Sequence, residues 1–346
     1  MRKKLHILLV SLFFLTCCVY GSLGAEDEGI IQDQQSTTNL SFIGEVSEPD
    51  SQLSGGNAQD VPTVYMTKNI TPEGLMSVYK ALGREATGKV AIKLHMGELG
   101  NTNYLSPDLI KDLVLSVNGT FVDSNTFYGG ARNNTPMHLQ VAKDHGFTYA
   151  PVDILDTDGE ISLPINGGIQ QKEAILGSHY KNYDFIISIA HFKGHAIAGF
   201  GGTFKNLAIG LASVKGKGKV HGAETLADAF ITPQPEFLEN VAEYTKAVAD
   251  DKGDKIVYIN VLNNLSVDCD CDGRAHKAEL ADIGILASLD PVALDKASVD
   301  QIYASPDEGK KHLIERIEAR NGTLVLDDAE KLGVGSQQYN LVSVDG

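Results

Sequence analysis

From residue 61 onward, short apolar runs alternate with amphipathic segments. Strands are predicted for six runs rich in β-branched and aromatic residues: 89–96, 120–127, 183–190, 255–262, 283–288 and 323–328. Helices are predicted for seven segments, most of which begin near a proline or a capping residue: 71–82, 107–117, 135–145, 170–180, 235–249, 291–303 and 306–319. Strands that alternate with helices predict an α/β fold with a mostly parallel sheet and helices on both faces. The length fits one large domain or two intimate halves.

The first 25 residues have the pattern of a secretory signal peptide. Three basic residues precede an apolar run at 7–20, and small residues follow it. That run is short for a membrane span. A lipid anchor at Cys17 or Cys18 is the alternative, although Thr or Cys precedes each of them where a small residue is usual. We expect an extracytoplasmic protein, either secreted or tethered to a membrane.

Residues 26–60 are rich in Asp, Glu, Gln, Ser and Gly, and predict a flexible polar linker to a folded domain at 61–346. The formal net charge of the chain is −16, and it becomes about −19 without the predicted signal. Such a surface repels nucleic acid and anionic lipid. We therefore expect no nucleic-acid partner, and membrane contact only through the signal or a lipid anchor.

Polar clusters follow four of the predicted strands, and the densest lies at 190–222. In open α/β sheets, ligands bind outside the carboxyl ends of the strands. Here glycines precede a predicted helix start, so that the backbone can approach a ligand and free N–H groups can hold an anion. The predicted ligand-binding residues of this segment are His191, Gly199, Gly201, Gly202 and Thr203.

The same segment holds the candidates for catalysis. Lys205 has apolar neighbours in sequence, which favours an amine that acts as nucleophile or ligand; the alternative is a side chain that extends to solvent. His195 and His221 accompany it, and three histidines within this segment favour function over an ordinary structural role. Lysines 215, 217 and 219 alternate with glycine and predict a mobile basic loop, either a solvated turn or an anion clamp.

Two cysteines, Cys269 and Cys271, lie beyond the predicted signal. The single residue between them is poor spacing for an unstrained disulfide. Together with aspartates 268, 270 and 272 they offer soft and hard metal ligands after a strand, and His276 can join them. The segment is therefore predicted to be a metal or redox site; an acidic turn with incidental thiols is the alternative.

Two other polar features follow predicted strands. His95 and Glu98 are predicted to be ligand-binding residues at the same end of the sheet as the segment 190–222. A structural loop is the alternative. Asp290 and Asp295 are predicted to be mainly structural, because Asp290 precedes a helix that begins at Pro291.

Four segments, 93–101, 190–210, 268–273 and 282–298, together resemble the DUF362 family, whose members are often described as iron–sulfur proteins. Many members carry a ferredoxin-like C-x-x-C-x-x-C-x-x-x-C-P run. This sequence has no such run, and Leu211 stands where many relatives have Cys. A ferredoxin cluster held by four cysteines is excluded, because only two thiols remain beyond the signal.

A more remote resemblance is to the catalytic domain of the nickel-pincer lactate racemase, through the run HAIAGFGGTFK at 195–205. It implies that His195 is an acid/base, that Lys205 holds the cofactor and that His221 ligates the metal. Gly201 departs from the serine of that pattern, and His95 is only a candidate for its second catalytic histidine. The predicted export also argues against a cofactor that is made inside cells.

These observations favour a metal-binding protein with a His/Lys/Gly-rich pocket, in which the metal is nickel, iron or zinc and Cys269 and Cys271 are further ligands. Whether the metal centre is catalytic stays open. One alternative is an extracytoplasmic protein that binds a small anion. Another is an electron-transfer protein with an iron–sulfur cluster shared between two chains.

Overall fold

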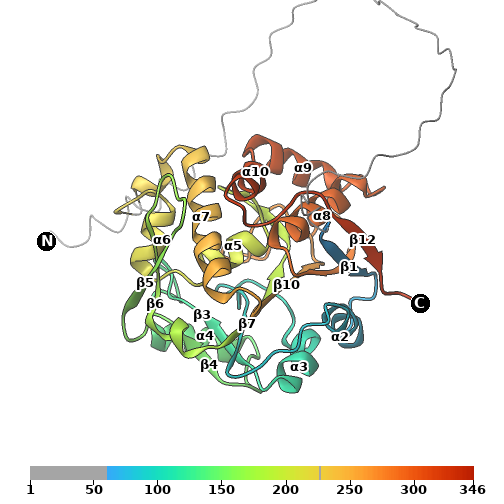
Figure 1. The fold of residues 1–346 in the computed structure, drawn as a ribbon, viewed down its shortest axis with the longest axis horizontal. Coiled ribbons are helices and arrows are strands. Elements are labelled where there is room, and N and C mark those ends of the chain that lie inside the picture. Colours follow the sequence, from blue (N-terminus) through green and yellow to red (C-terminus); the bar gives the residue numbers. More distant parts are fainter. Residues whose placement is uncertain (1–60, 226) are drawn as a thin grey trace, which may run out of the picture. The chain divides into compact units, whose positions relative to one another are not determined.

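An eight-stranded sheet runs through the part of the chain that this computed structural model describes, residues 61–346 except residue 226 (Figure 1). The predicted signal peptide and linker fall on residues 1–60 and lie outside the described residues. The strand order is β12-β1-β11-β10-β7-β2-β3-β4. The bounds are β1 Thr63–Thr67, β2 Val90–Lys93, β3 Thr120–Asp123, β4 Val152–Ile154, β7 Phe185–His191, β10 Ile256–Leu262, β11 Gly284–Ser288 and β12 Asn340–Ser343.

Most neighbouring strands are parallel, as the sequence predicts. Strands β10, β7, β2, β3 and β4 form one parallel block. Strand β11 runs antiparallel between β10 and β1, and β12 pairs in parallel with β1 at the edge. The carboxyl ends of the five strands of the parallel block therefore meet at one edge of the sheet.

Helices cover both faces of the sheet, which confirms the predicted layers (Figure 1). Alternate residues of β10 point to different cores: Val257 and Ile259 pack with α2 and α3, whereas Ile256 and Tyr258 pack with α5, α7, α8 and α10. The helices are α2 Pro72–Ala81, α3 Pro107–Ser116, α4 Thr135–Asp144, α5 Thr203–Ala208, α6 Val214–Val220, α7 Gln234–Lys252, α8 Pro291–Ala304, α9 Lys310–Ala319 and α10 Leu324–Lys331. None of these helices is both long and apolar enough to cross a bilayer.

Two short hairpins and two 3₁₀ turns complete the described elements. The hairpins pair β5 Glu160–Pro164 with β6 Glu173–Gly177, and β8 Lys193–His195 with β9 Gly199–Gly201. The 3₁₀ turns are η1 Ser178–Asn182 and η2 Asp228–Phe230.

Two predicted elements have the wrong type. The predicted helix at 170–180 is strand β6 followed by η1, because the buried residues Ala174–Leu176 pair with β5, in which exposed and half-buried residues alternate. The predicted strand at 323–328 is the start of α10. Its buried positions Val325, Leu326 and Ala329 show helical spacing only when the window is extended beyond the run.

The predicted basic loop at 215–219 is also wrong, because these residues form α6. The Ser213 hydroxyl accepts a hydrogen bond from Gly216 N–H and caps the helix. The three lysines consequently face different surroundings. Lys217 is buried, while Lys215 is exposed and pairs with Glu160 at 3.1 Å.

Candidate functional site

Charged and polar side chains gather where the parallel strands end. Lys93 closes β2, Asp123 closes β3 and His191 closes β7, and the loop after β10 carries Asp270; all four are buried. Polar residues thus cluster at the edge where the sequence predicts them, outside the carboxyl ends of the strands.

The two thiols lie beside an imidazole in this region. One ring nitrogen of His195 and the sulfur atoms of Cys269 and Cys271 lie within 4.8 Å of one another. Both cysteines are free thiols. Cys271 N–H donates to the Cys269 sulfur at 3.3 Å. The hydrogen bond between the thiols lowers the pKa of Cys269 well below its usual value, and the charges of Lys205 and Lys193 act in the same direction. The same hydrogen bond raises the pKa of Cys271.

The His195 ring is held by the turn between β8 and β9. Its Nδ1 accepts hydrogen bonds from Ile197 N–H at 3.1 Å and Ala198 N–H at 2.9 Å. Burial, and then the charge of Lys205, holds the pKa of His195 well below its ordinary value. The ring is therefore neutral, its proton is on Nε2, and Nε2 is the nitrogen left to face a ligand.

His191 and Asp270 form the polar floor of the site. The Asp270 carboxylate lies 2.8 Å from Nδ1 of His191 and 2.9 Å from Nζ of Lys193. Burial raises the pKa of Asp270, but the charges of His191 and Lys193 outweigh burial and hold this pKa well below its usual range. Nε2 of His191 donates to the Asn263 carbonyl at 2.6 Å. Both ring nitrogens of His191 are thus occupied by the protein itself.

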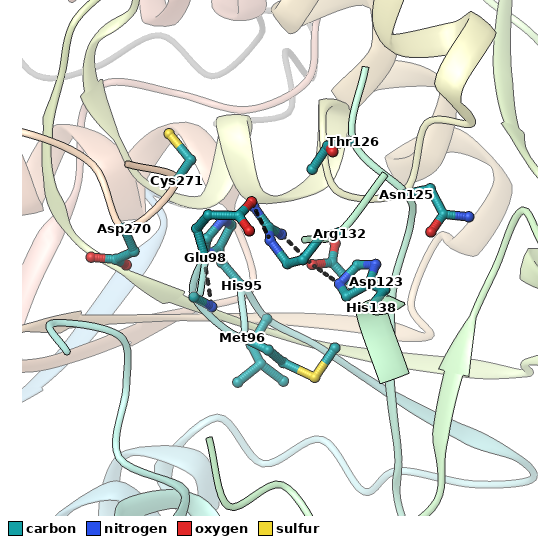
Figure 2. Close-up of polar contacts among 12 residues, drawn as sticks. His95, Met96, Glu98, Asp123, Asn125, Thr126, Arg132, His138, Asp270 and Cys271 are labelled. Carbon is teal, nitrogen blue, oxygen red and sulfur yellow. Dashed lines mark hydrogen bonds and ion pairs between the residues drawn. The ribbon is translucent and has the colours of Figure 1, made fainter. Parts of the chain in front are cut away.

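A second buried ion network lies near the loop that carries Asp270 and Cys271 (Figure 2). Arg132 bridges Glu98, at 3.2 Å, and Asp123, at 3.4 Å, and Asp123 also pairs with Lys93 at 3.2 Å. Figure 2 shows Arg132 between the two carboxylates, with His138 on the far side of Asp123. Glu98 N–H in turn donates to the Asp270 carbonyl, so the network is joined to the cysteine loop.

His95 and Glu98 are predicted to lie at this edge of the sheet, and both do. His95 Nδ1 accepts a hydrogen bond from Gly97 N–H at 3.1 Å. Burial, and then the charges of Arg132 and Lys193, holds the pKa of His95 well below its ordinary value. Its roles in ligand binding and catalysis stay predictions.

Lys205 and His221 both lie close enough to His195 to affect its pKa. The positive charge of Lys205 contributes to lowering the pKa of His195, His221 and Cys269. Burial is the largest cause at His221 and brings its pKa to about 4. The His221 ring stacks on Phe237, with 4.7 Å between ring centres. The structure therefore brings His195, Lys205 and His221 within electrostatic reach of one another, but the ligand group within 4.8 Å contains His195 and not His221.

The glycine-rich helix start does not offer free N–H groups to an anion, contrary to the prediction for Gly202 and Thr203. The Asp295 carboxylate accepts the N–H groups of Thr203, at 2.8 Å, and Phe204, at 3.1 Å. A Cβ on Gly202 would lie 2.6 Å from this carboxylate, so glycine makes room for it. The predicted structural role of Asp295 agrees with this contact.

The other glycines of the segment make close backbone contacts. Gly199 has a φ of +81° and packs against Gly322, where a Cβ would lie 2.9 Å from Cα. A Cβ on Gly201 would lie 3.5 Å from the Lys193 side chain and 3.8 Å from that of Lys205. Gly201 therefore borders the side chains of the two lysines whose charges lower the pKa of Cys269.

His276 does not join the cysteines. Its ring nitrogens face the carboxylates of Asp272, at 3.0 Å, and Asp268, at 3.5 Å. The sequence reasoning also missed Lys93, Arg132 and His138 as site residues. A lysine in an apolar strand or a lone arginine in a loop carries no distinguishing signal until its buried partners are known.

Several buried polar atoms of the described residues have no hydrogen-bond partner, and all lie on loops or helices at this edge. They are Ser124 Oγ, Asn125 Oδ1, both ring nitrogens of His138, His221 Nδ1, Asn263 Oδ1 and Asp270 Oδ1. Of these, Nε2 of His138 lies 3.7 Å from the Asp123 carboxylate, beyond hydrogen-bond distance but within that of an ion pair. Native proteins pair most buried polar groups. Their concentration here indicates a region built to receive ligand or water atoms.

The comparisons with known proteins identify a family. The family model named Domain of unknown function (DUF362) matches residues 90–300, more than half of the chain. The chain belongs to the DUF362 family. The described part of this DUF362 chain carries two free cysteines, Cys269 and Cys271. No curated protein matches it.

Two solved structures are similar to parts of this DUF362 chain. The lactate racemase apoprotein from Thermoanaerobacterium thermosaccharolyticum is 17% identical with a TM-score of 0.36, over 57% of this chain and 50% of that chain. A Thermotoga maritima protein from the Northeast Structural Genomics Consortium is 11% identical with a TM-score of 0.38, over 75% of this chain and 58% of that chain. The DUF362 chain thus spans about half the length of the lactate racemase. At these scores neither likeness bears on its ligand or reaction.

Proposed function

We propose that the protein binds a thiophilic metal ion through Cys269, Cys271 and His195. The observation that carries this proposal is the approach of two sulfurs and one imidazole nitrogen to within 4.8 Å. Thiolate and imidazole ligands suit zinc among the nickel, iron and zinc that the sequence suggests. The charges of Lys193 and Lys205 favour the thiolate form that a metal requires.

The hydrogen bonds of the His195 ring decide in which form it could bind an ion. Metal-bound histidines usually donate the N–H of the other ring nitrogen to an acceptor. At His195, Nδ1 instead accepts two backbone N–H groups, so an ion at Nε2 would release the Nε2 proton to solvent and would bind the ring as an imidazolate, whose charge the two N–H groups would stabilise. Three protein ligands leave a fourth position open, as in catalytic rather than structural zinc sites.

The proposal has two further parts, which concern catalysis and the location of the protein. The first is that the metal centre is catalytic, with His195 and Lys205 beside the substrate; bound zinc would supply Lewis-acid polarisation there. The charge of Lys205 already acts on both His195 and Cys269, which supports its place beside the centre. The second is that the protein works outside the cytoplasm, which rests on the signal-like residues 1–25.

Metal analysis of protein purified anaerobically and reconstituted with Zn²⁺ tests the proposal. Wild type is expected to retain about one zinc per chain, and Cys269→Ser and Cys271→Ser to retain almost none. His276→Ala is the matched control, because His276 is occupied by Asp268 and Asp272, and it should retain zinc. Background zinc in reconstituted wild type, or equal zinc in the cysteine variants, contradicts the proposal.

A further inference from the structure

A buried ion pair ties the strand that carries His195 to the cysteine loop, residues 266–271. Lys193 lies two residues before His195 in β8. Asp270 lies between Cys269 and Cys271 in sequence. The Lys193 amine and the Asp270 carboxylate are 2.9 Å apart, and both side chains are buried. One side chain from each segment thus joins the two segments that supply the proposed metal ligands.

The spacing within β8 makes this ion pair act on the His195 ring. Alternate residues of a strand point to the same side, so Lys193 and His195 share one side of β8. Asp270, which binds Lys193, is the direct neighbour of both cysteines in sequence. Contact between Lys193 and Asp270 therefore brings the imidazole and the two sulfurs toward the same space. They do lie within 4.8 Å of one another.

The backbone of the cysteine loop contacts β8 at a second point. Gly194 N–H donates to the Ser266 carbonyl at 2.8 Å. A Cβ on Gly194 would lie 2.1 Å from the Val267 carbonyl oxygen, so only glycine allows this close approach. The backbone contact holds residues 266–267 against β8, and the ion pair holds residues 269–271.

Two other ion pairs link the cysteine loop to the fold, through β7 and α9. His191, at the end of β7, lies 2.8 Å from the Asp270 carboxylate. Arg316 of α9 lies 2.8 Å from the Asp268 carboxylate. Among the ion pairs of the described residues, Lys193–Asp270 is therefore the one that joins the loop to the strand of His195.

We propose that the Lys193–Asp270 ion pair positions the ligands of the metal site: it sets the place of the His195 ring relative to the two thiols, so that one ion can bind all three. This inference rests on the metal site proposed above. In this role neither Lys193 nor Asp270 is a ligand, and each acts through its neighbours in the chain. Groups that hold metal ligands in place typically contribute about 10- to 100-fold to metal affinity.

Zinc titration of the anaerobically purified full chain tests the proposal, with histidine-selective ¹⁵N NMR as the readout. In the wild type, Nε2 of His195 is expected to change from a protonated to a metal-bound nitrogen as one zinc per chain is added. Asp270→Asn keeps the size of the side chain but removes its charge, so the ion pair with Lys193 is lost.

In Asp270→Asn, His195 is expected to keep its protonated Nε2 after one equivalent of zinc. Competition with a chelator should show zinc affinity weakened by about 10- to 100-fold. A role of Asp270 in stability alone would lower the melting temperature without changing which atoms bind zinc.

Arg316→Met is the matched control, because it removes another ion pair of the cysteine loop, and Arg316 belongs to α9 rather than β8. It should bind zinc within about threefold of the wild type, since this ion pair is partly exposed. Its His195 signal is expected to match that of the wild type.

The outcomes separate this inference from the metal proposal. A wild type that binds no zinc overturns both. A wild type whose His195 binds zinc, together with an unchanged His195 signal and zinc affinity in Asp270→Asn, overturns only the positioning role. If Asp270→Asn does not fold, Lys193→Met breaks the same ion pair, and zinc binding equal to that of Arg316→Met then overturns this role.

Discussion

At the scale of single residues, buried charge sets the character of this protein. Asp270 is completely buried, yet its carboxylate stays ionised because His191 and Lys193 contact it directly. A buried carboxylate held by an ammonium and an imidazole stays ionised only while these partners are present. The buried contacts among His191, Lys193 and Asp270 thus depend on the Asp270 carboxylate.

Asp270→Asn is expected to lower the free energy of unfolding by about 3–5 kcal/mol, because Lys193 would remain buried without a counter-charge. Urea denaturation at neutral pH measures the loss. Asp254→Asn is the control, since Asp254 pairs with Arg84 at the surface, and a loss of about 0–1 kcal/mol is expected. Equal losses in the two variants would refute the role of Asp270.

Lys217 gives the pH dependence of stability a definite sign. Burial lowers its pKa from 10.5 to about 8, against the attraction of Asp123 and Asp156. Between these two pH values the unfolded chain binds the proton more than the folded chain does. The free energy of unfolding therefore rises with pH across this window, by about 3 kcal/mol in total.

Lys217→Met removes this pH-dependent contribution to the free energy of unfolding. The variant is expected to be more stable than the wild type near pH 7, and to lose the stability rise between pH 8 and 10.5. Urea denaturation at a series of pH values compares it with Lys215→Met, which should keep the rise. A Lys217→Met protein that is less stable at pH 7 would show that the ammonium already has a strong partner in the folded chain.

Only some residues of the site could be predicted from the sequence. His95, Glu98 and His195 follow strands and were placed at the correct edge. Arg132 and Lys93 were not chosen, because their importance comes from burial against Glu98 and Asp123, which lie on other segments of the chain. Such pairings arise only when the sheet brings its strand ends together.

At the scale of elements, α5 depends on a carboxylate from another helix. Asp295 of α8 caps the first two N–H groups of α5, and Gly202 leaves the space that it occupies. The sequence predicted the helix start correctly, but it could not show that α8 supplies its cap. The N–H groups that the sequence pattern offers to an anionic ligand are thus taken by a side chain from a distant part of the chain.

Gly202→Ala is expected to lower the free energy of unfolding by about 1–3 kcal/mol, because its Cβ would meet the Asp295 carboxylate at 2.6 Å. Thermal and urea denaturation measure the effect. Gly129→Ala is the matched control, since a Cβ there has no neighbour within 4 Å. A harmless Gly202→Ala would mean that Asp295 does not hold α5 in this way.

Elements with long, regular patterns were predicted well, whereas two shorter segments, 170–180 and 323–328, were assigned the wrong type. Strand β10 and helix α8 match their predicted positions, because burial on both faces or a proline start marks them clearly. The run at 323–328 was ambiguous, since a segment of six residues with three consecutive apolar positions fits a helix as well as a strand. Tertiary pairing with β5 decided the type of β6.

At the scale of the whole molecule, alternation of strands and helices was enough to predict the α/β fold and the edge that carries the site. The formal net charge of −16 adds a long-range effect. An acidic protein attracts a divalent cation, and salt screens this attraction over a Debye length of about 30 Å at 0.01 M and about 8 Å at 0.15 M.

The association rate constant of Zn²⁺ is therefore expected to fall about tenfold between those two ionic strengths. The dissociation rate constant should change by less than about twofold, because it reflects contacts within the site. Stopped-flow competition with a zinc indicator measures both. A rate of association that rises with salt would show that the buried cations, rather than the acidic surface, dominate the approach.

The central claim is that two sulfurs and one imidazole of this chain hold a metal ion, and X-ray absorption at the zinc edge tests it most directly. The zinc-loaded protein is predicted to show two sulfur neighbours at about 2.3 Å and nitrogen at about 2.0 Å, with sulfur lost in Cys269→Ser/Cys271→Ser. A spectrum with only oxygen and nitrogen neighbours, or a wild type that holds no zinc, would contradict the account.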